Sequence, residues 1–134
     1  MKFEQYVPEA NRFLKEVAHE LGNVADSNHA YRMLRNVLHT IREILTPEES
    51  SHLIAQLPLL IKGVYVDGWK MQPTKRIRSI EEFFERLRLK SDLPEKDLNN
   101  DEEAINKVQG VLYVLQKYVS AGEMTHIINQ FPGE

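Results

Sequence analysis

One segment of the chain occurs twice. Residues 30–58 align without a gap on residues 104–132, and most aligned pairs are identical or keep their chemical character. A fixed offset over this length indicates a duplicated supersecondary unit. Two such units usually pack as similar halves, so we expect any functional site to be shared between the halves or present twice. The identical pairs are Ala30/Ala104, Val37/Val111, Leu38/Leu112, Glu49/Glu123, His52/His126, Ile54/Ile128, Gln56/Gln130 and Pro58/Pro132.

Apolar residues recur at helical spacing along nearly the whole chain, and no segment shows a convincing strand period. This pattern predicts an all-α fold with six main helices, three in each half. Because a three-helix unit has too few faces to bury its own apolar stripe, the halves should pack as one bundle with pseudo-two-fold symmetry. We therefore expect a single domain over residues 1–134, with repeat one at 8–65, a linker at 66–78 and repeat two at 79–132.

Three helix starts carry a capping box, in which a Ser or Thr and a Glu three residues later cap each other's backbone. These are Thr46–Glu49, Ser79–Glu82 and Ser120–Glu123. Pro58 should end the helix that begins after Thr46, because proline breaks a helix interior. Leu59–Tyr65 should then continue as a further helical turn or two.

The composition excludes several classes of protein. A net charge of −3 argues against a protein that coats nucleic acid through bulk charge. The chain has no cysteine, which excludes disulfides, thiolate metal sites and a cysteine nucleophile. The longest apolar run, Leu57–Ile61, is too short to cross a bilayer, and the N-terminus lacks the apolar stretch of a signal peptide. We expect a cytoplasmic protein without a membrane partner.

Short motifs on both sides of the linker resemble those of a known family. A Gln-Leu-Pro ending is followed by Gly-Trp, and the second half closes on a similar ending. With these motifs the chain resembles a bacterial family known only as domain of unknown function 2267, over nearly its whole length. The resemblance implies a small helical bacterial protein and supplies no established activity or catalytic residues. The matching residues are Ala30, Gln56-Leu57-Pro58, Tyr65, Gly68-Trp69, Pro73, Arg76, Phe83 and Gln130-Phe131-Pro132.

The repeated segment carries a doubled Glu-x-x-His motif. Residues three apart lie on the same face of a helix, so both side chains of a pair can reach one metal ion. Ferritin-like di-iron proteins use two such pairs together with glutamates from other helices. One interpretation is therefore a ferritin-like, di-iron type of metal-binding bundle that holds iron, manganese or zinc. Its ligands would be Glu49, His52, Glu123 and His126.

The same residues have a simpler explanation. Both glutamates occupy the third helical position of a predicted capping box, which explains them without a metal. Each histidine has a glutamine four residues later, so the pair can form a hydrogen bond on a polar face or at the contact between halves. Together with the tryptophan of the linker, these residues would form an interaction surface. Its members are His52, Gln56, Trp69, His126 and Gln130.

The linker is basic and contains the only tryptophan of the chain. Basic residues beside aromatic residues can bind phosphates and stack on bases, but no RNA- or DNA-binding module is recognisable. We expect Trp69 to pin the linker onto the bundle, and the cations to pair with acids of residues 80–85 or with helix ends. Nucleic acid is therefore not an expected partner. The cations are Lys70, Lys75, Arg76 and Arg78, against one acid, Asp67.

No catalytic set emerges from the sequence. A Gly-x-Ser-x-Gly elbow is missing, the glycines are dispersed, and His39 with Glu43 is explained by a solvated ion pair on a helix. The preferred interpretation is a non-catalytic interaction or structural module that binds a protein partner or itself and needs no cofactor. The alternative is the metal-binding bundle described above.

Overall fold

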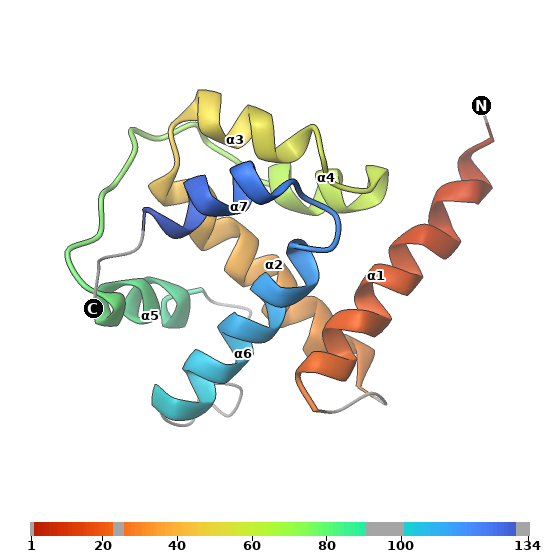
Figure 1. The fold of residues 1–134 in the computed structure, drawn as a ribbon, viewed down its shortest axis with the longest axis horizontal. Coiled ribbons are helices and arrows are strands. Elements are labelled where there is room, and N and C mark those ends of the chain that lie inside the picture. The colour runs from red at the N-terminus through yellow and green to blue at the C-terminus, as the bar shows by residue number, and fades with distance from the viewer. Residues whose placement is uncertain (1, 23–25, 91–100, 131–134) are drawn as a thin grey trace.

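The computed structural model describes residues 2–22, 26–90 and 101–130, and this part of the chain is helical without a strand (Figure 1). The prediction of an all-α fold is confirmed. Phe131 and Pro132, which close the predicted second repeat, lie outside the described residues. Within these ranges, a 3-10 turn, Phe3–Gln5, precedes seven α-helices: α1 (Tyr6–Glu20), α2 (Ser27–Ile44), α3 (Pro47–Ile54), α4 (Leu59–Val66), α5 (Ile80–Arg88), α6 (Asp101–Leu115) and α7 (Ala121–Ile128).

The centre of the fold is α2, which runs through the middle of the molecule in Figure 1. Most of its residues are buried, including polar residues such as Asn36 and Thr40. A helix that is buried on most of its surface must be surrounded by other elements. Four helices pack against it, namely α1, α4, α5 and α6. The hydrophobic core is therefore built around α2 from both halves of the sequence.

The prediction of six main helices, three in each half, is wrong for the first half. Pro58 has an extended backbone with ψ of 149° and acts as the N-cap of a separate helix, α4. Proline has no backbone N–H, so it ends α3 and suits the start of the next helix. The segment expected to add a turn or two to α3 thus forms a helix that packs on α1 and α2.

The aligned core positions of the two halves are not buried equally. Val37, Leu38 and Val111 are fully buried, whereas Leu112 is only partly buried at the edge of the core.

Gly110 lies where α6 crosses α1, and a Cβ added there would lie 3.3 Å from Cβ of Glu20. This position therefore favours glycine, because a larger residue would push the two helices apart.

In the described part of the chain, no helix combines the length and the apolar character that crossing a membrane requires.

His39 holds α4 onto α2. The expectation of a solvated His39–Glu43 pair is wrong, because His39 is only 4% exposed and its Nε2 donates a hydrogen bond to the Val64 carbonyl at 2.7 Å. Burial lowers the pKa of His39 to about 4, and the nearby Arg42 and Arg35 act in the same direction. The hydrogen bond to Val64 opposes this shift but does not outweigh it. The imidazole is consequently neutral at pH 7.

The buried neutral His39 makes stability depend on pH. The pKa of His39 is about 4 in the folded protein and 6.5 in the unfolded chain. The contribution of the neutral imidazole to the free energy of unfolding is therefore complete above pH 6.5 and is lost as the pH falls toward 4. We expect this group to remove up to about 3 kcal/mol of unfolding free energy over that range. The measurement is urea unfolding as a function of pH for the wild type and His39→Gln, whose amide can still donate to Val64.

The exposed His19 provides the matched control. His19→Gln should keep the pH slope of the wild type, whereas His39→Gln should flatten the slope between pH 4 and 6.5. Equal slopes in all three proteins would contradict a buried, neutral His39.

Candidate functional site

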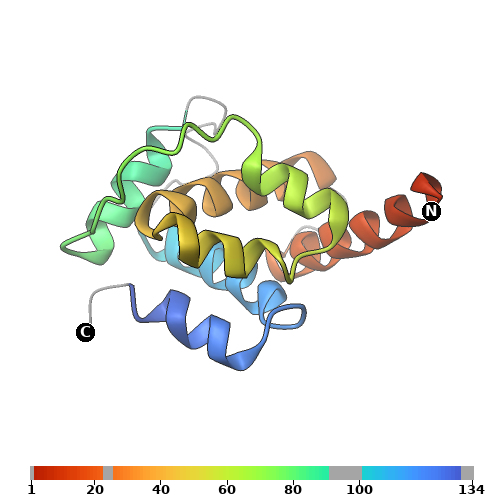
Figure 2. The same ribbon diagram turned by 90° about the horizontal axis from the view of Figure 1, so that it is seen from above.

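Helices α3 and α7 lie side by side, as both views show (Figures 1 and 2). They run in opposite directions, since Glu49 at the start of α3 contacts His126 near the end of α7. At the other end, Gln56 just after α3 contacts Ser120 at the start of α7. The doubled Glu-x-x-His motif therefore meets at one seam between segments far apart in the sequence, which we call the α3–α7 seam.

Glu49 serves both helices. Its Oε1 accepts a hydrogen bond from the Thr46 backbone at 2.7 Å, which completes the predicted capping box with the Thr46 hydroxyl. Its Oε2 lies 2.6 Å from Nε2 of His126. Partial burial opposes ionisation, but the hydrogen bonds from Thr46 and His126 outweigh it and lower the pKa of Glu49. The ionised carboxylate thus caps α3 and binds α7 at once.

Gln56 takes over a capping role that the sequence assigns to Glu123. The Ser120 hydroxyl accepts a hydrogen bond from the Glu123 backbone as predicted, but the Ser120 N–H donates to Oε1 of Gln56 at 2.6 Å. The box at Ser120 is therefore completed from the other half of the chain. Similarly, Glu82 in α5 accepts from the backbone of Arg78 instead of from Ser79. The predicted reciprocal capping is correct only for Thr46–Glu49.

The freed Glu123 carboxylate lies beside both histidines. Glu123 is 9% exposed, and its buried Oε2 has no hydrogen-bond partner among the residues that the structure describes. With His52, Ser120 and His126 it lines a shallow depression at the α3–α7 seam. In the described part of the chain, no three His, Asp or Glu side chains are grouped so that they could hold a metal ion. The four residues that the ferritin-like interpretation names as ligands thus lie near one another at the seam, but they are not arranged as a metal-binding set.

The predicted interaction residues have different surroundings. Gln56 and His126 contact each other's helices, while His52 is exposed and Gln130 makes only a local bond to the His126 carbonyl at 3.3 Å. Trp69 is partly buried against the core, with its ring edge-on to Tyr65 at 5.9 Å. The expectation that Trp69 pins the linker onto the bundle is consistent with this contact.

The linker is fastened to α2 and α4 by polar contacts. Nη1 of Arg42 donates to the carbonyls of Tyr65 at 2.6 Å and Asp67 at 2.8 Å, which fixes the end of α4. Further along, the Lys75 backbone donates to the Glu43 carbonyl at 2.9 Å and the Thr74 hydroxyl donates to the Leu45 carbonyl at 3.3 Å. The linker consequently follows the C-terminal end of α2.

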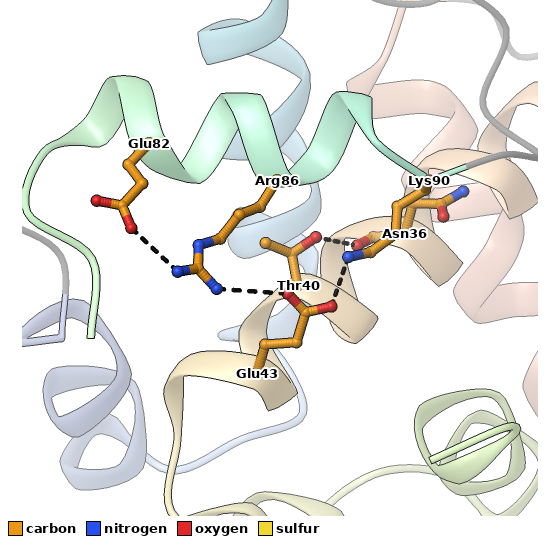
Figure 3. Close-up of polar contacts among 6 residues, drawn as sticks. All are labelled: Asn36, Thr40, Glu43, Glu82, Arg86 and Lys90. Carbon is orange, nitrogen blue, oxygen red and sulfur yellow. Dashed lines mark hydrogen bonds and ion pairs between the residues drawn. The ribbon is translucent and has the colours of Figure 1, made fainter. Parts of the chain in front are cut away.

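A charge cluster joins α5 to α2 (Figure 3). Glu43 lies 3.8 Å from Arg86 and 2.5 Å from Nζ of Lys90, and Arg86 also binds Glu82 at 3.0 Å. All four side chains are partly buried, so solvent screens these pairs less than it screens pairs on a fully open surface. Sequence analysis did not find this cluster, because its residues come from helices far apart in the chain.

These features define the class of the protein as a small helical bundle whose halves are joined around α2 and through the α3–α7 seam. The chain matches the family described as "Uncharacterized conserved protein (DUF2267)" over residues 10–134, and it belongs to that family. The resemblance seen in the sequence is thereby confirmed. A search of curated proteins finds no match.

The seam predicts unequal effects for two equivalent glutamines. Gln56 and Gln130 bond alike to their own helices, at 3.4 Å to the His52 carbonyl and 3.3 Å to the His126 carbonyl, but only Gln56 caps α7. Gln56→Ala should lower the unfolding free energy by about 0.5–1 kcal/mol more than Gln130→Ala, because it leaves the Ser120 N–H uncapped. Urea unfolding of both variants measures the difference, and equal effects would show that the cross-helix bond contributes nothing.

Proposed function

We propose that the protein is a non-catalytic interaction module that pairs with a second copy of itself through the start of α1 and the start of α4. The observation that supports this is that the 3-10 turn before α1, the start of α1 and the start of α4 all carry exposed apolar side chains, and α1 contacts both the turn and α4. Isolated exposed apolar residues are common, whereas a group on neighbouring elements is typical of an interface. The residues and their exposed fractions are Phe3 73%, Val7 49%, Leu59 39% and Leu60 43%.

The apolar stripe along α1 extends beyond the part of the helix that the core of the protein covers. Apolar residues alternate at spacings of four and three through Phe3, Val7, Ala10, Leu14, Val17 and Leu21, which is the heptad spacing of helices that pack along a seam. Val17 is fully buried, and Ala10 and Leu14 pack partly against the core. The first turns extend away from the other helices in both views (Figures 1 and 2), and Phe3 and Val7 continue the stripe there.

A second copy suits this stripe in shape and charge. In a symmetric pair, each copy offers the same surface, so one contact covers both stripes. The α1 helices would run antiparallel across the two-fold axis. Along the stripe, the acids Glu4 and Glu9 come before the exposed bases Arg12 and Lys15. Antiparallel pairing therefore places the acids of one copy opposite the bases of the other, which favours this register.

Size-exclusion chromatography with light scattering tests the pairing. The wild type should shift from monomer to dimer mass as concentration rises, and Val7→Asp should raise the dimer dissociation constant at least about tenfold, because it places a charge in an apolar contact. Ile105→Asp is the matched control, since Ile105 is an apolar residue on α6 with 37% exposure. A wild type that stays monomeric, or equal effects of both variants, would contradict the proposal.

A metal-binding bundle is the second candidate, favoured by one observation. The buried Oε2 of Glu123 has no partner, and His52 and His126 line the same depression. A metal ion there would require side-chain rotation, since the described residues hold no assembled ligand set.

Elemental analysis of the untagged protein, after reconstitution with iron, manganese or zinc, tests the metal candidate. If the protein binds a metal at this seam, the analysis should find close to one metal ion per chain. The double variant His52→Ala/His126→Ala should lose this metal, and His19→Ala should keep it. Metal-free protein after reconstitution, or equal metal content in both variants, would exclude this function for the α3–α7 seam.

A further inference from the structure

The linker carries cations that the bundle does not neutralise. Residues 69–77 have no regular secondary structure, and backbone and side-chain bonds fasten this stretch to α2. Lys70, Lys75 and Arg76 are exposed, and within the described residues none of them has an ion pair. Of the two expected arrangements, pairing with the acids of residues 80–85 or with helix ends, the first does not occur for these three within the described residues.

Three of the nearby acids, Glu43, Glu82 and Asp67, are already paired with other groups. Glu43 is bound by Arg86 and Lys90, and Glu82 is bound by Arg86 and by the backbone of Arg78. Asp67, the one acid of the linker, lies 3.8 Å from Arg35 of α2. The linker thus presents a locally positive surface on a chain whose net charge is −3. Such a local excess attracts polyanions even when the net charge does not.

Two depressions meet on this surface. The first is lined by Arg42, Lys70, Lys75 and the partly buried Trp69. The second lies against α5, and its charged lining residues are the cations Lys75, Arg78, Arg86 and Lys90 and the acids Glu43, Glu82 and Glu85. Glu43 and Lys75 line both, so the depressions adjoin at these residues. The result is a cationic path along the linker with an aromatic side chain in its first part, and we call it the linker groove.

We propose that the linker groove binds single-stranded nucleic acid. Phosphates would follow Lys70 and Lys75, which line the groove, and the exposed Arg76 next to Lys75 in the chain, and a base would lie against Trp69. Proteins that bind single strands with little sequence preference combine these two elements, a positively charged groove and aromatic side chains. A single strand fits an irregular, extended segment, whereas reading duplex DNA in its major groove requires a helix or β-ribbon there. This inference does not depend on self-association through α1.

Trp69 provides the readout because it is the only tryptophan in the chain. Titration with an oligothymidylate of about 16 nucleotides, a typical upper site size, should change the Trp69 fluorescence at low salt. Three phosphate contacts should give a slope of log affinity against log salt of about −2. The variant Lys70→Gln/Lys75→Gln/Arg76→Gln should bind at least about tenfold more weakly and lose most of this slope.

A variant with the same change in net charge separates the groove from bulk charge. Lys2→Gln/Lys62→Gln/Lys117→Gln removes three cations that line neither depression of the linker groove, and this variant should bind the oligonucleotide as the wild type does. Far-UV circular dichroism checks that both variants stay helical. The proposal fails if the fluorescence does not respond to the oligonucleotide, or if both variants weaken binding equally. It also fails if a duplex or phosphatidylserine vesicles bind as well as the single strand.

Discussion

The burial of α2 is the constraint on which the rest of the structure depends. Helices from both halves pack on it, so its buried polar side chains bond inside the protein, although Oδ1 of Asn36 has no partner among the described residues. Asn36 and Thr40 bond to carbonyls one turn earlier in the same helix, at 2.7 Å each. His39 reaches α4, and Glu43 reaches α5 and the linker. The polar residues of α2 thus determine where the neighbouring segments lie.

The two copies of the repeated motif perform different tasks in the fold. Glu49 caps α3 and binds His126, while the aligned Glu123 is buried with an unpartnered oxygen. Gln56 caps α7, while the aligned Gln130 bonds only locally. An imidazole and an amide from opposite halves therefore hold the α3–α7 seam together. Their use inside the chain also explains why we place the partner surface on α1 and α4, where apolar side chains are exposed.

Sequence reasoning predicts best what depends on neighbours in the chain. The helical periodicity, the capping box at Thr46 and the hydroxyl cap at Ser120 are all local, and the structure bears them out. It predicts poorly what depends on contacts between distant segments. The bond from Ser120 to Gln56 and the pairing of Glu43 with Lys90 join residues far apart in sequence, and no local pattern encodes them. The burial of His39 has the same origin, since α4 covers it only after folding.

If α2 is the common core, the two halves should unfold as one cooperative unit, and native-state hydrogen exchange measures this directly. We expect the slowest amides of α2, α4 and α6 to share one opening free energy, equal to that of global unfolding. Exposed ends such as the first turns of α1 should open more easily. If the slowest amides of α5, α6 and α7 instead exchange through a separate opening of clearly lower free energy, the halves are independent units and α2 does not hold them together.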